Sequence, residues 1–540
     1  MSADKRVSML FVVCLLAGPA RPQDWPSFRG PNASGLAAGA NPPLRWDAEA
    51  GRNVRWRTLI PGLGHSSPVV VGDRVFLTTA VALNGTFMVP HGLTGDMLTS
   101  NDNGPQAWIV MCLDVNTGAV RWQKVVYSGF PRSRRHPMNS YATPTPAVSS
   151  DRVVVSFGSE GLYCFSLNGE LIWKRDLGAL NVGSIENPDF QWGYASSPVI
   201  YHNRVIVQCD RDHNPFIATF RLSDGTQIWR TRREDLPSWS TPTIVEWRGK
   251  AQVVTLAPSF VRGYDLRTGQ ELWRLYWGLD TVECTPIATD GVIYFSAGRG
   301  RTGPILAVRA NAKGDITLNG GQESNEFVIW SRMRGGGLTT TPILMNGYLY
   351  VLTNLGILRC FEAHTGKLIY EQRVGPADFL AAPVAAAGRI YLTSQEGEIF
   401  VIRDGPKFEL LATNSMGDIC QATPAMLHDK ILIRTRGALY AIQEGAEEPK
   451  ISFRDVTREA GLEFRSLPPL LDPRMRHINS LWANFIAGVA VGDFDGDGFD
   501  DIFVVASRLG EKNKLYRNRG DMTFEECDRG NGASRSQRQQ

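Results

Sequence analysis

Short apolar runs alternate with turn residues along most of the chain, and residues 339–371 show this pattern most clearly. Four runs of β-branched, aromatic and aliphatic residues are separated there by the turn sequences NG at 346, NLG at 354 and HTG at 364. This spacing predicts a four-stranded antiparallel meander. Apolar side chains fall on both faces of the predicted strands, so other parts of the protein must cover each side of the sheet.

The opening of this unit, two small residues and a proline before an apolar run, recurs along the chain. Its eight copies begin at residues 66, 142, 196, 240, 284, 340, 381 and 422. A Gly turn that leads into an outer strand with an aromatic residue recurs as well, at Trp122, Trp173, Trp229, Trp273, Trp330 and Tyr370, with a weaker copy at 408–411. Regular repetition of one four-stranded unit is the signature of a β-propeller.

The eighth hairpin has no outer strand after it, but a matching strand stands before the first hairpin. Residues 53–57, NVRWR, carry Trp56 at the position of the other outer tryptophans. A chain that begins with the last strand of its final blade closes a ring, because its first and last segments share one sheet. We therefore predict an all-β fold, an eight-bladed β-propeller of four-stranded antiparallel blades closed by the N-terminal strand.

The repeated openings and the D-x-x-TG-x-x-x-W closings resemble the PQQ-like, or quinoprotein-type, propeller repeat. DWPSFRGPNASG at 24 and GLGHSSP at 62 are similar to secreted bacterial members of that family. The resemblance covers roughly residues 24–445. It implies the fold but leaves the function open, because the family includes quinone-dependent dehydrogenases, outer-membrane assembly scaffolds and uncharacterised proteins.

The N-terminus has the features of an export signal. Lys5 and Arg6 precede an apolar run over residues 7–17, and Gly18-Pro19-Ala20 offers small residues to a signal peptidase. We expect cleavage after Ala20 and a periplasmic or secreted location. The apolar run is too short to span a bilayer, so we expect no transmembrane segment.

Composition argues against several functions. A formal net charge of +3 over 540 residues is small, so we expect no nucleic-acid partner. The eight cysteines form no Cys-x-x-Cys or Cys-x-x-Cys-His motif, which excludes a thioredoxin site and a c-type haem. Cys112, Cys164 and Cys360 occupy the same place in their repeats, and we expect them to be small buried apolar residues.

The long loops are expected on one face of the ring. In a four-stranded blade the 1–2 and 3–4 turns lie on one face, the short-turn face, and here they are short throughout. The 2–3 loops and the blade-to-blade connections lie on the opposite face, and they include all the long excursions, namely 79–107, 127–141, 178–194, 231–239 and 297–304. We call this second face the long-loop face, and binding sites usually lie on such loops.

Candidate ligand contacts lie on the long-loop face. Those expected nearest the channel mouth precede the strand-one prolines, namely His65, Tyr141, Tyr194, Trp239 and Glu283. The further candidates are Gln191, Trp192, Arg211, Asp212 and Arg299. For each residue, a solvated loop position or an aromatic plug is the alternative interpretation.

A change in composition near residue 446 marks a second region. AGVAVGDFDGDGFDDIFVV at 487 and NKLYRNRGDMTFEE at 513 resemble an FG-GAP or VCBS repeat. Its D-x-D-x-D-G-x-x-D loop is matched by Asp493, Asp495, Asp497 and Asp501, and the Phe499 carbonyl can add a further ligand. Three alternate carboxylates and a Gly bend wrap oxygen atoms around a hard cation, so we expect Ca²⁺ here. An acidic surface turn without an ion is the alternative.

These features divide the chain into four segments. We predict a signal peptide at 1–20, the propeller at 21–446, a partial FG-GAP segment at 447–527 and a disordered tail at 528–540. The third segment is a small, incomplete β unit, because such domains are built from several copies of the repeat and this chain carries one.

Two functions are compatible with this organisation. The first is an exported, non-catalytic scaffold that presents its long-loop face to a protein or saccharide partner. The second is a PQQ-dependent alcohol or sugar dehydrogenase; the resemblance implies for such enzymes a disulfide between adjacent cysteines, and this sequence has no Cys-Cys pair. We therefore favour the scaffold, assign no catalytic residue and do not expect PQQ. The basic connection FPRSRRHP at 130–137 leaves polyanion binding as a third alternative.

Overall fold

The computed structural model describes residues 24–84, 99–102, 104–183, 187, 190–298, 303–446, 456–464, 488–495, 499–506, 512–520 and 523–527. The predicted signal peptide at 1–20 and the predicted disordered tail at 528–540 lie outside these residues. The chain divides into two compact units, Met1–Pro449 and Lys450–Gln540. Where the structure describes the chain, no helix is both long enough and apolar enough to cross a bilayer.

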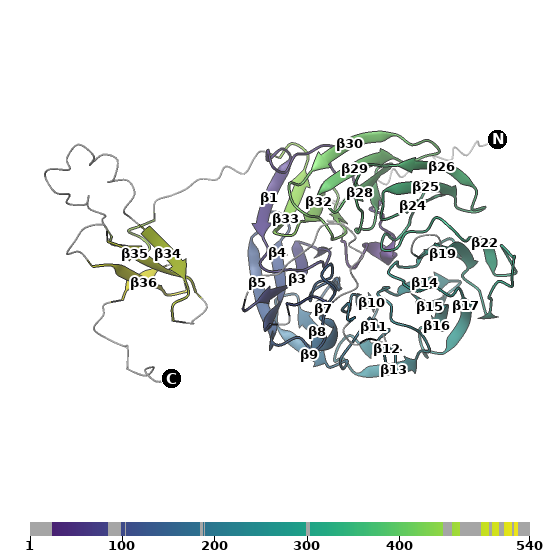
Figure 1. The fold of residues 1–540 in the computed structure, drawn as a ribbon, viewed down its shortest axis with the longest axis horizontal. Helices are drawn as coiled ribbons and strands as arrows, with labels where there is room; N and C mark the ends of the chain where they lie inside the picture. The colour runs from purple at the N-terminus through teal and green to yellow at the C-terminus, as the bar shows by residue number, and fades with distance from the viewer. Residues whose placement is uncertain are drawn as a thin grey trace, which may run out of the picture. The chain divides into compact units, whose positions relative to one another are not determined.

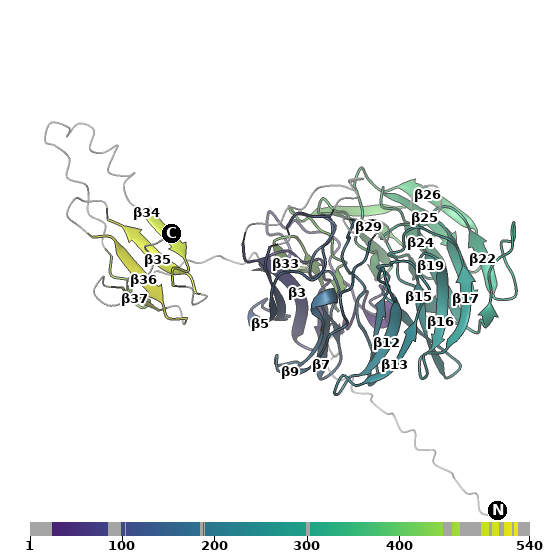
Figure 2. The same ribbon diagram turned by 60° about the horizontal axis from the view of Figure 1, so that its bottom comes forward.

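Eight antiparallel sheets make up the described part of the first unit, and they stand side by side around a central axis (Figures 1 and 2). The first two sheets hold β2 (Val69–Val71), β3 (Arg74–Ala82), β4 (Gln106–Asp114) and β5 (Val120–Gly129), then β6 (Ala147–Val148), β7 (Arg152–Ser156), β8 (Leu162–Ser166) and β9 (Leu171–Arg175). The next two hold β10 (Val199–Tyr201), β11 (Arg204–Cys209), β12 (Phe216–Arg221) and β13 (Gln227–Arg232), then β14 (Thr243–Trp247), β15 (Lys250–Leu256), β16 (Phe260–Asp265) and β17 (Glu271–Tyr276).

The strands of the other four sheets are given below from the innermost strand outwards, as they are above. The first two of these sheets hold β18 (Ile287–Thr289), β19 (Val292–Ser296), β20 (Ile305–Arg309) and β22 (Val328–Arg332), then β23 (Ile343–Met345), β24 (Tyr348–Leu352), β25 (Ile357–Glu362) and β26 (Leu368–Arg373). The last two hold β27 (Val384–Ala386), β28 (Arg389–Thr393), β29 (Glu398–Arg403) and β30 (Leu410–Ser415), then β31 (Ala425–Met426), β32 (Lys430–Arg434), β33 (Ala438–Gln443) and β1 (Val54–Leu59). The all-β propeller architecture is confirmed.

The N-terminal strand closes the ring as the sequence predicts. β1 pairs antiparallel with β33, with Val54 opposite Ile442 and Leu59 opposite Ala438. In Figure 1 the purple β1 lies beside the green β33, although the two strands are at opposite ends of this unit's sequence. The first and last segments of the propeller therefore share one sheet.

Two local features differ from the predicted pattern. The outer strand expected at 408–411 is β30, Leu410–Ser415, so it begins later and runs further. In the fifth unit, the long detour before Trp330 contains β21 (Gly314–Asp315), which adds a parallel strand to the outer edge of the preceding sheet, beside β17. Cys112, Cys164 and Cys360 are buried and are not in disulfides, as expected.

The outer tryptophans link neighbouring blades. Trp173 Nε1 donates to the Leu222 carbonyl of the next sheet (2.8 Å), and its ring covers Gly225 in that sheet's 3–4 turn, where an added Cβ would lie 2.7 Å from the indole. Trp229 makes the same contacts with the next blade in turn, at Leu266 and Gly269. The Trp of one repeat and the Gly of the following repeat are thus two halves of one interface, which explains why both recur.

The small residue immediately before each strand-one proline also has a structural role. The backbone N–H of Ser67 donates to Thr145 Oγ1 of the next sheet (3.0 Å), and that of Thr145 donates to Ser197 Oγ (3.0 Å). Ser197 N–H donates in the same way to Thr241 Oγ1 (3.0 Å). These hydroxyl groups satisfy backbone donors that face the channel, where the inner strands have no further neighbour.

The segment before β1 closes one end of the channel. We call residues 24–41 the N-terminal plug; it contains η1 (Pro31–Ala33), and Trp25 exchanges backbone hydrogen bonds with Val70 (2.9 and 2.8 Å). Further along, Asn41 N–H donates to the carbonyl of His428, in the 1–2 turn of the eighth sheet (2.7 Å). The plug therefore crosses the short-turn face.

The plug is fixed at its centre by Arg29, whose side chain is fully buried. Its guanidinium donates to the carbonyls of Pro342 (2.8 Å), Thr341 (3.2 Å) and Pro383 (3.3 Å), which belong to two different sheets. Burial lowers the pKa of Arg29 to about 9. Arg29 thus ties the plug to two blades through backbone carbonyl groups.

The described residues of the second unit form one small sheet. Its strands are β34 (Gly488–Gly492), β35 (Asp501–Val505), β36 (Lys514–Asn518) and β37 (Phe524–Glu526), paired antiparallel in sequence order. The acidic loop lies between β34 and β35. A single four-stranded meander is consistent with one copy of the FG-GAP repeat.

Candidate functional site: a cup on the propeller axis

The residues that lead into the innermost strands of all eight sheets line one cavity of about 310 Å³. These connections belong to the long-loop face, so the cavity is the mouth of the channel on that face. Phe28 of the N-terminal plug also lines it. The result is a cup that opens on the long-loop face and is floored by the plug.

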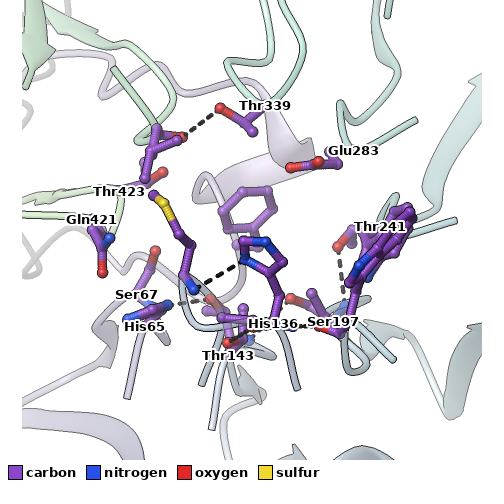
Figure 3. A pocket seen from close by; sticks show the side chains of 18 of the residues that line it. His65, Ser67, His136, Thr143, Ser197, Thr241, Glu283, Thr339, Gln421 and Thr423 are labelled. Atoms are coloured by element: carbon purple, nitrogen blue, oxygen red, sulfur yellow. Dashed lines mark hydrogen bonds between the residues drawn. The ribbon is translucent and has the colours of Figure 1, made fainter. Parts of the chain in front are cut away.

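The wall of the cup follows one position of the repeat. The residue three places before the strand-one proline lines the cavity in every blade; these residues are His65, Thr143, Ala195, Trp239, Glu283, Thr339, Leu380 and Gln421. Figure 3 labels five of them, His65, Thr143, Glu283, Thr339 and Gln421, around the same space. The repeat thus delivers one variable side chain per blade to the axis.

Four of the predicted ligand contacts meet in this cup, namely His65, Trp192, Trp239 and Glu283. Tyr141, Tyr194, Gln191, Arg211 and Asp212 are not among its lining residues, and Arg299 lies outside the described residues. Tyr194 turns away from the axis, since its hydroxyl donates to the Gln208 carbonyl (2.9 Å). Tyr141 packs edge-on against Trp108, with ring centroids 6.0 Å apart.

The two tyrosines fall outside the cup because they occupy a different register. Tyr194 stands four residues before Pro198, and Tyr141 stands five before Pro146, whereas the cup position is three before. Ala195 and Thr143 hold that position in these two blades. Counting from the proline that begins the strand would have found both residues from the sequence.

An aromatic pair forms one side of the cup. The rings of Trp192 and Trp239 lie 5.6 Å apart between centroids, with an interplanar angle of 38°. Trp239 Nε1 donates to the Gly193 carbonyl (2.7 Å), and Asn139 Nδ2 donates to the Trp192 carbonyl (2.7 Å). The first contact holds the indole of Trp239, and the second holds the backbone at Trp192.

The basic connection at 130–137 contributes mainly structure. Arg135 is fully buried; it forms an ion pair with Asp102 and donates to the carbonyls of Pro137 (2.9 Å) and Asn139 (2.5 Å). It holds the loop that carries His136 and Asn139 to the cup (Figure 3). Since this guanidinium is used internally, it is not available to a polyanion.

His65 is a strongly perturbed titratable group of the cup. Burial, reinforced by the nearby charges of Arg434 and Arg135, lowers its pKa to about 3. The imidazole is therefore neutral at neutral pH. Its Nε2 atom is shielded from solvent and has no hydrogen-bond partner among the residues that the structure describes.

The acidic loop of the second unit brings three carboxylates together. Oxygen atoms of Asp493, Asp495 and Asp501 lie within 4.8 Å of one another. Asp501 is held by the backbone N–H groups of Phe494 (3.0 Å) and Asn518 (2.8 Å), while Asp495 also pairs with Arg517 (2.6 Å). Asp497 lies outside the described residues, and Phe499 is exposed beside the loop. The donor set is all oxygen, which suits Ca²⁺.

Both units of the chain are similar to known protein families. The family model described as "Outer membrane protein assembly factor BamB" matches residues 105–320 and 319–448, and the FG-GAP repeat model matches residues 485–516. An outer membrane protein assembly factor BamB from Yersinia pestis is 24% identical over 336 residues, which cover 54% of this chain and 79% of that protein.

Two solved structures share the fold. A europium-containing methanol dehydrogenase has a TM-score of 0.55 at 12% identity, over 77% of this chain and 90% of that one. The quinohemoprotein alcohol dehydrogenase ADHIIG from Pseudomonas putida HK5 has a TM-score of 0.50 at 11% identity, over 85% of each chain. At such identities these similarities concern the fold alone.

Proposed function

The chain belongs to the PQQ-like propeller family whose model is described as outer membrane protein assembly factor BamB, and on that premise we propose that it is an exported, non-catalytic scaffold for a protein partner. The observation that carries this proposal is the cup, because it gathers one variable side chain from every blade on the face that bears the long loops. A rigid ring with variable loops on one face is suited to recognition.

The relative from Yersinia pestis supports both the partner class and the compartment. Its name describes an assembly factor for outer membrane proteins. A corresponding role for this chain requires export to the periplasm, which agrees with the predicted signal peptide ending at Ala20. Binding of a saccharide instead of a protein is the alternative for this face.

The dehydrogenase alternative rests on fold similarity to two alcohol-oxidising enzymes. PQQ carries three carboxylate groups, which require cationic partners when they are buried. Among the cup residues that the structure describes there is no lysine or arginine, and Glu283 adds a negative charge. The described cup residues therefore offer no cation to these carboxylates, and we derive no catalytic step from PQQ.

Site-specific photo-crosslinking tests the scaffold proposal. With a photoreactive amino acid at Trp192, on the long-loop face, we expect a covalent adduct with a periplasmic protein in the native host. The matched control replaces Trp247, a half-buried tryptophan at the 1–2 turn of the fourth sheet on the short-turn face. Adducts confined to the Trp247 position would contradict the proposal, and reduction of a dye by an alcohol after addition of PQQ and calcium would favour the dehydrogenase.

For the second unit, we propose that the acidic loop binds Ca²⁺ with an affinity in the micromolar to millimolar range typical of extracellular modules. The convergence of Asp493, Asp495 and Asp501 supports this assignment. Their mutual repulsion disfavours the ion-free loop, and a divalent cation removes it.

Calorimetric titration of calcium into chelator-stripped protein checks this prediction. We expect binding heat in the wild type and at least a tenfold loss of affinity in Asp495→Ala, since a direct ligand is removed. Asp500→Asn is the matched control, because Asp500 is adjacent in sequence but does not belong to the converging group. Wild-type protein that gives no heat would leave the acidic surface turn as the correct interpretation.

A further inference from the structure

We propose that two copies of this chain associate through β34, the edge strand of the second unit, which pairs antiparallel with β34 of the other copy about a two-fold axis. The partner is therefore a second copy of the same chain, and the two small sheets join into one continuous sheet. This inference is independent of the proposed scaffold and calcium-binding roles.

The first argument is the free edge of β34. This strand lies at one edge of the sheet of the second unit, and β37 lies at the other (Figure 2). Among the residues that the structure describes, the ladder with β35 is the only backbone pairing of β34. All five residues of the strand, Gly488–Gly492, are exposed. Since alternate residues of an edge strand direct their N–H and C=O groups outwards, β34 presents donors and acceptors to a further strand.

The outer strands of the propeller show how this protein protects its other sheet edges. Charged side chains on an edge strand, or a segment that covers it, prevent pairing with another chain. Strands with at least one lysine, arginine or glutamate are β1, β5, β9, β13, β17, β22 and β26. The uncharged outer strand β30 is covered, because Asp47 forms a parallel bridge with Ser415 and Ala48 N–H donates to the Ser415 carbonyl (3.1 Å).

β34 has neither form of protection within the described part of the chain. Its sequence, GVAVG, contains no charged residue and no proline. The opposite edge of the same sheet is different, since β37 carries Glu525 and Glu526. Pairing through the second unit is therefore expected at β34 and not at β37.

The sequence of β34 is symmetric about Ala490, which favours pairing of the strand with itself. In an antiparallel pair centred on Ala490, Val489 stands opposite Val491 of the second copy. Gly488 stands opposite Gly492 in the same way. Val489 and Val491 are 65% and 64% exposed and point to the same face of the sheet, so the two-fold axis creates two cross-strand valine pairs. A contact between identical surfaces requires this self-complementarity.

The charges next to β34 favour the antiparallel arrangement. The acidic loop that begins at Asp493 directly follows the strand. Antiparallel pairing places the two acidic loops at opposite ends of the joined strands, whereas parallel pairing would place them side by side. Two paired strands of five residues form a contact much smaller than the roughly 1,600 Å² of a typical stable interface, so we expect a weak dimer with a Kd of about 10–100 µM.

Sedimentation velocity of the full-length protein at about 1–200 µM tests the proposal. We expect monomers at the lowest concentration and mostly dimers at the highest. Val489→Lys/Val491→Lys is expected to weaken association at least tenfold, because like charges then face each other across the two-fold axis. A wild type that stays monomeric over this range, or a lysine variant that dimerises as the wild type does, would overturn the proposal.

Val120→Lys/Val125→Lys is the matched control. Both valines lie on β5, the outer strand of the first propeller sheet, and are 46% and 59% exposed. This double change adds the same charge at another exposed strand and should leave association unchanged. Loss of the dimer in this control, with the dimer retained in the β34 variant, would place the contact on the propeller and reject the inference.

A charge-reversed variant separates a lost contact from a lost fold. Val489→Glu/Val491→Glu is expected to be monomeric by itself, but to associate with the lysine variant in an equimolar mixture, because opposite charges then face each other. Absence of mixed dimers would contradict the pairing. Amide hydrogen exchange of the wild type at high and low concentration provides a measurement without any substitution. Concentration-dependent protection is expected in β34, and protection confined to β37 would show that the contact is at the opposite edge.

Discussion

Replacing Asp210 by alanine is expected to lower the free energy of unfolding by about 3–5 kcal/mol, because the buried Arg233 then keeps only the more distant carboxylate of Asp235, at 3.7 Å. The carboxylate of Asp210 and the guanidinium of Arg233 are both fully buried, and Arg233 Nε donates to Asp210 Oδ1 at 2.6 Å. Gln208 Nε2 (2.6 Å) and Ser238 Oγ (2.8 Å) donate to the other oxygen. This cluster joins the third sheet to the fourth, since Arg233 also donates to Tyr264 Oη at 2.9 Å.

Chemical denaturation of three variants checks this prediction. The double variant Asp210→Leu/Arg233→Met removes both charges and should recover most of the loss, since Asp235 keeps its ion pair with Arg262 (2.5 Å). Glu409→Ala, which breaks the exposed Arg403–Glu409 pair, is expected to cost less than about 1 kcal/mol. A small cost for Asp210→Ala, similar to that of Glu409→Ala, would show that the buried pair does not stabilise the interface.

The Asp210 cluster illustrates where sequence reasoning reached its limit. Arg211 and Asp212 were predicted as ligand contacts because they stand in a 2–3 loop, yet the adjacent Asp210 is the residue that the fold buries. Consecutive side chains of a strand point to opposite faces, so a shift of one residue at the end of a strand exchanges a buried side chain for an exposed one. Periodicity predicts which segments are strands, but it does not predict which loop residue turns inward at their ends.

The ring itself could be predicted because its signal is repeated. Each strand-one proline marks the start of an inner strand, and the missing outer strand of the eighth unit pointed to residues 53–57, which pair with β33. The N-terminal plug gave no such signal. Arg29 binds backbone carbonyls that are far away in sequence, and no pattern of residue types encodes an acceptor that every residue possesses.

The candidate site could be predicted from the sequence only in part. Trp239 and Glu283 were found because they are chemically distinctive and stand at the repeated cup position. Thr143, Ala195 and Leu380 occupy the same position, but nothing in their chemistry draws attention to them. The position three residues before each strand-one proline identifies the cup residues, and the type of residue at that position does not.

Truncation of the ring-closing tryptophan, Trp56→Ala, is expected to lower the free energy of unfolding by about 3–5 kcal/mol, the upper range for a buried aromatic residue. Trp56 is 5% exposed, and its Nε1 donates to the Val115 carbonyl of the first sheet (3.0 Å). Its ring covers Gly118, where an added Cβ would lie 2.6 Å from the indole. It therefore makes, between the eighth and first sheets, the contact that Trp173 and Trp229 make elsewhere in the ring.

Loss of Trp56 should release a single strand, β1, which loss of the other outer tryptophans should not do. No turn joins β1 to its neighbour β33, so weakening the interface of β1 also frees the edge of β33. We expect Trp56→Ala to increase amide hydrogen exchange in β1 and β33 before the rest of the ring, whereas Trp229→Ala, within a sheet of consecutive strands, should not release a single strand. Leu59→Ala on the same strand is the control, because Leu59 is 68% exposed and should cost little. Equal melting temperatures of the wild type and Trp56→Ala would show that closure of the ring does not depend on this residue.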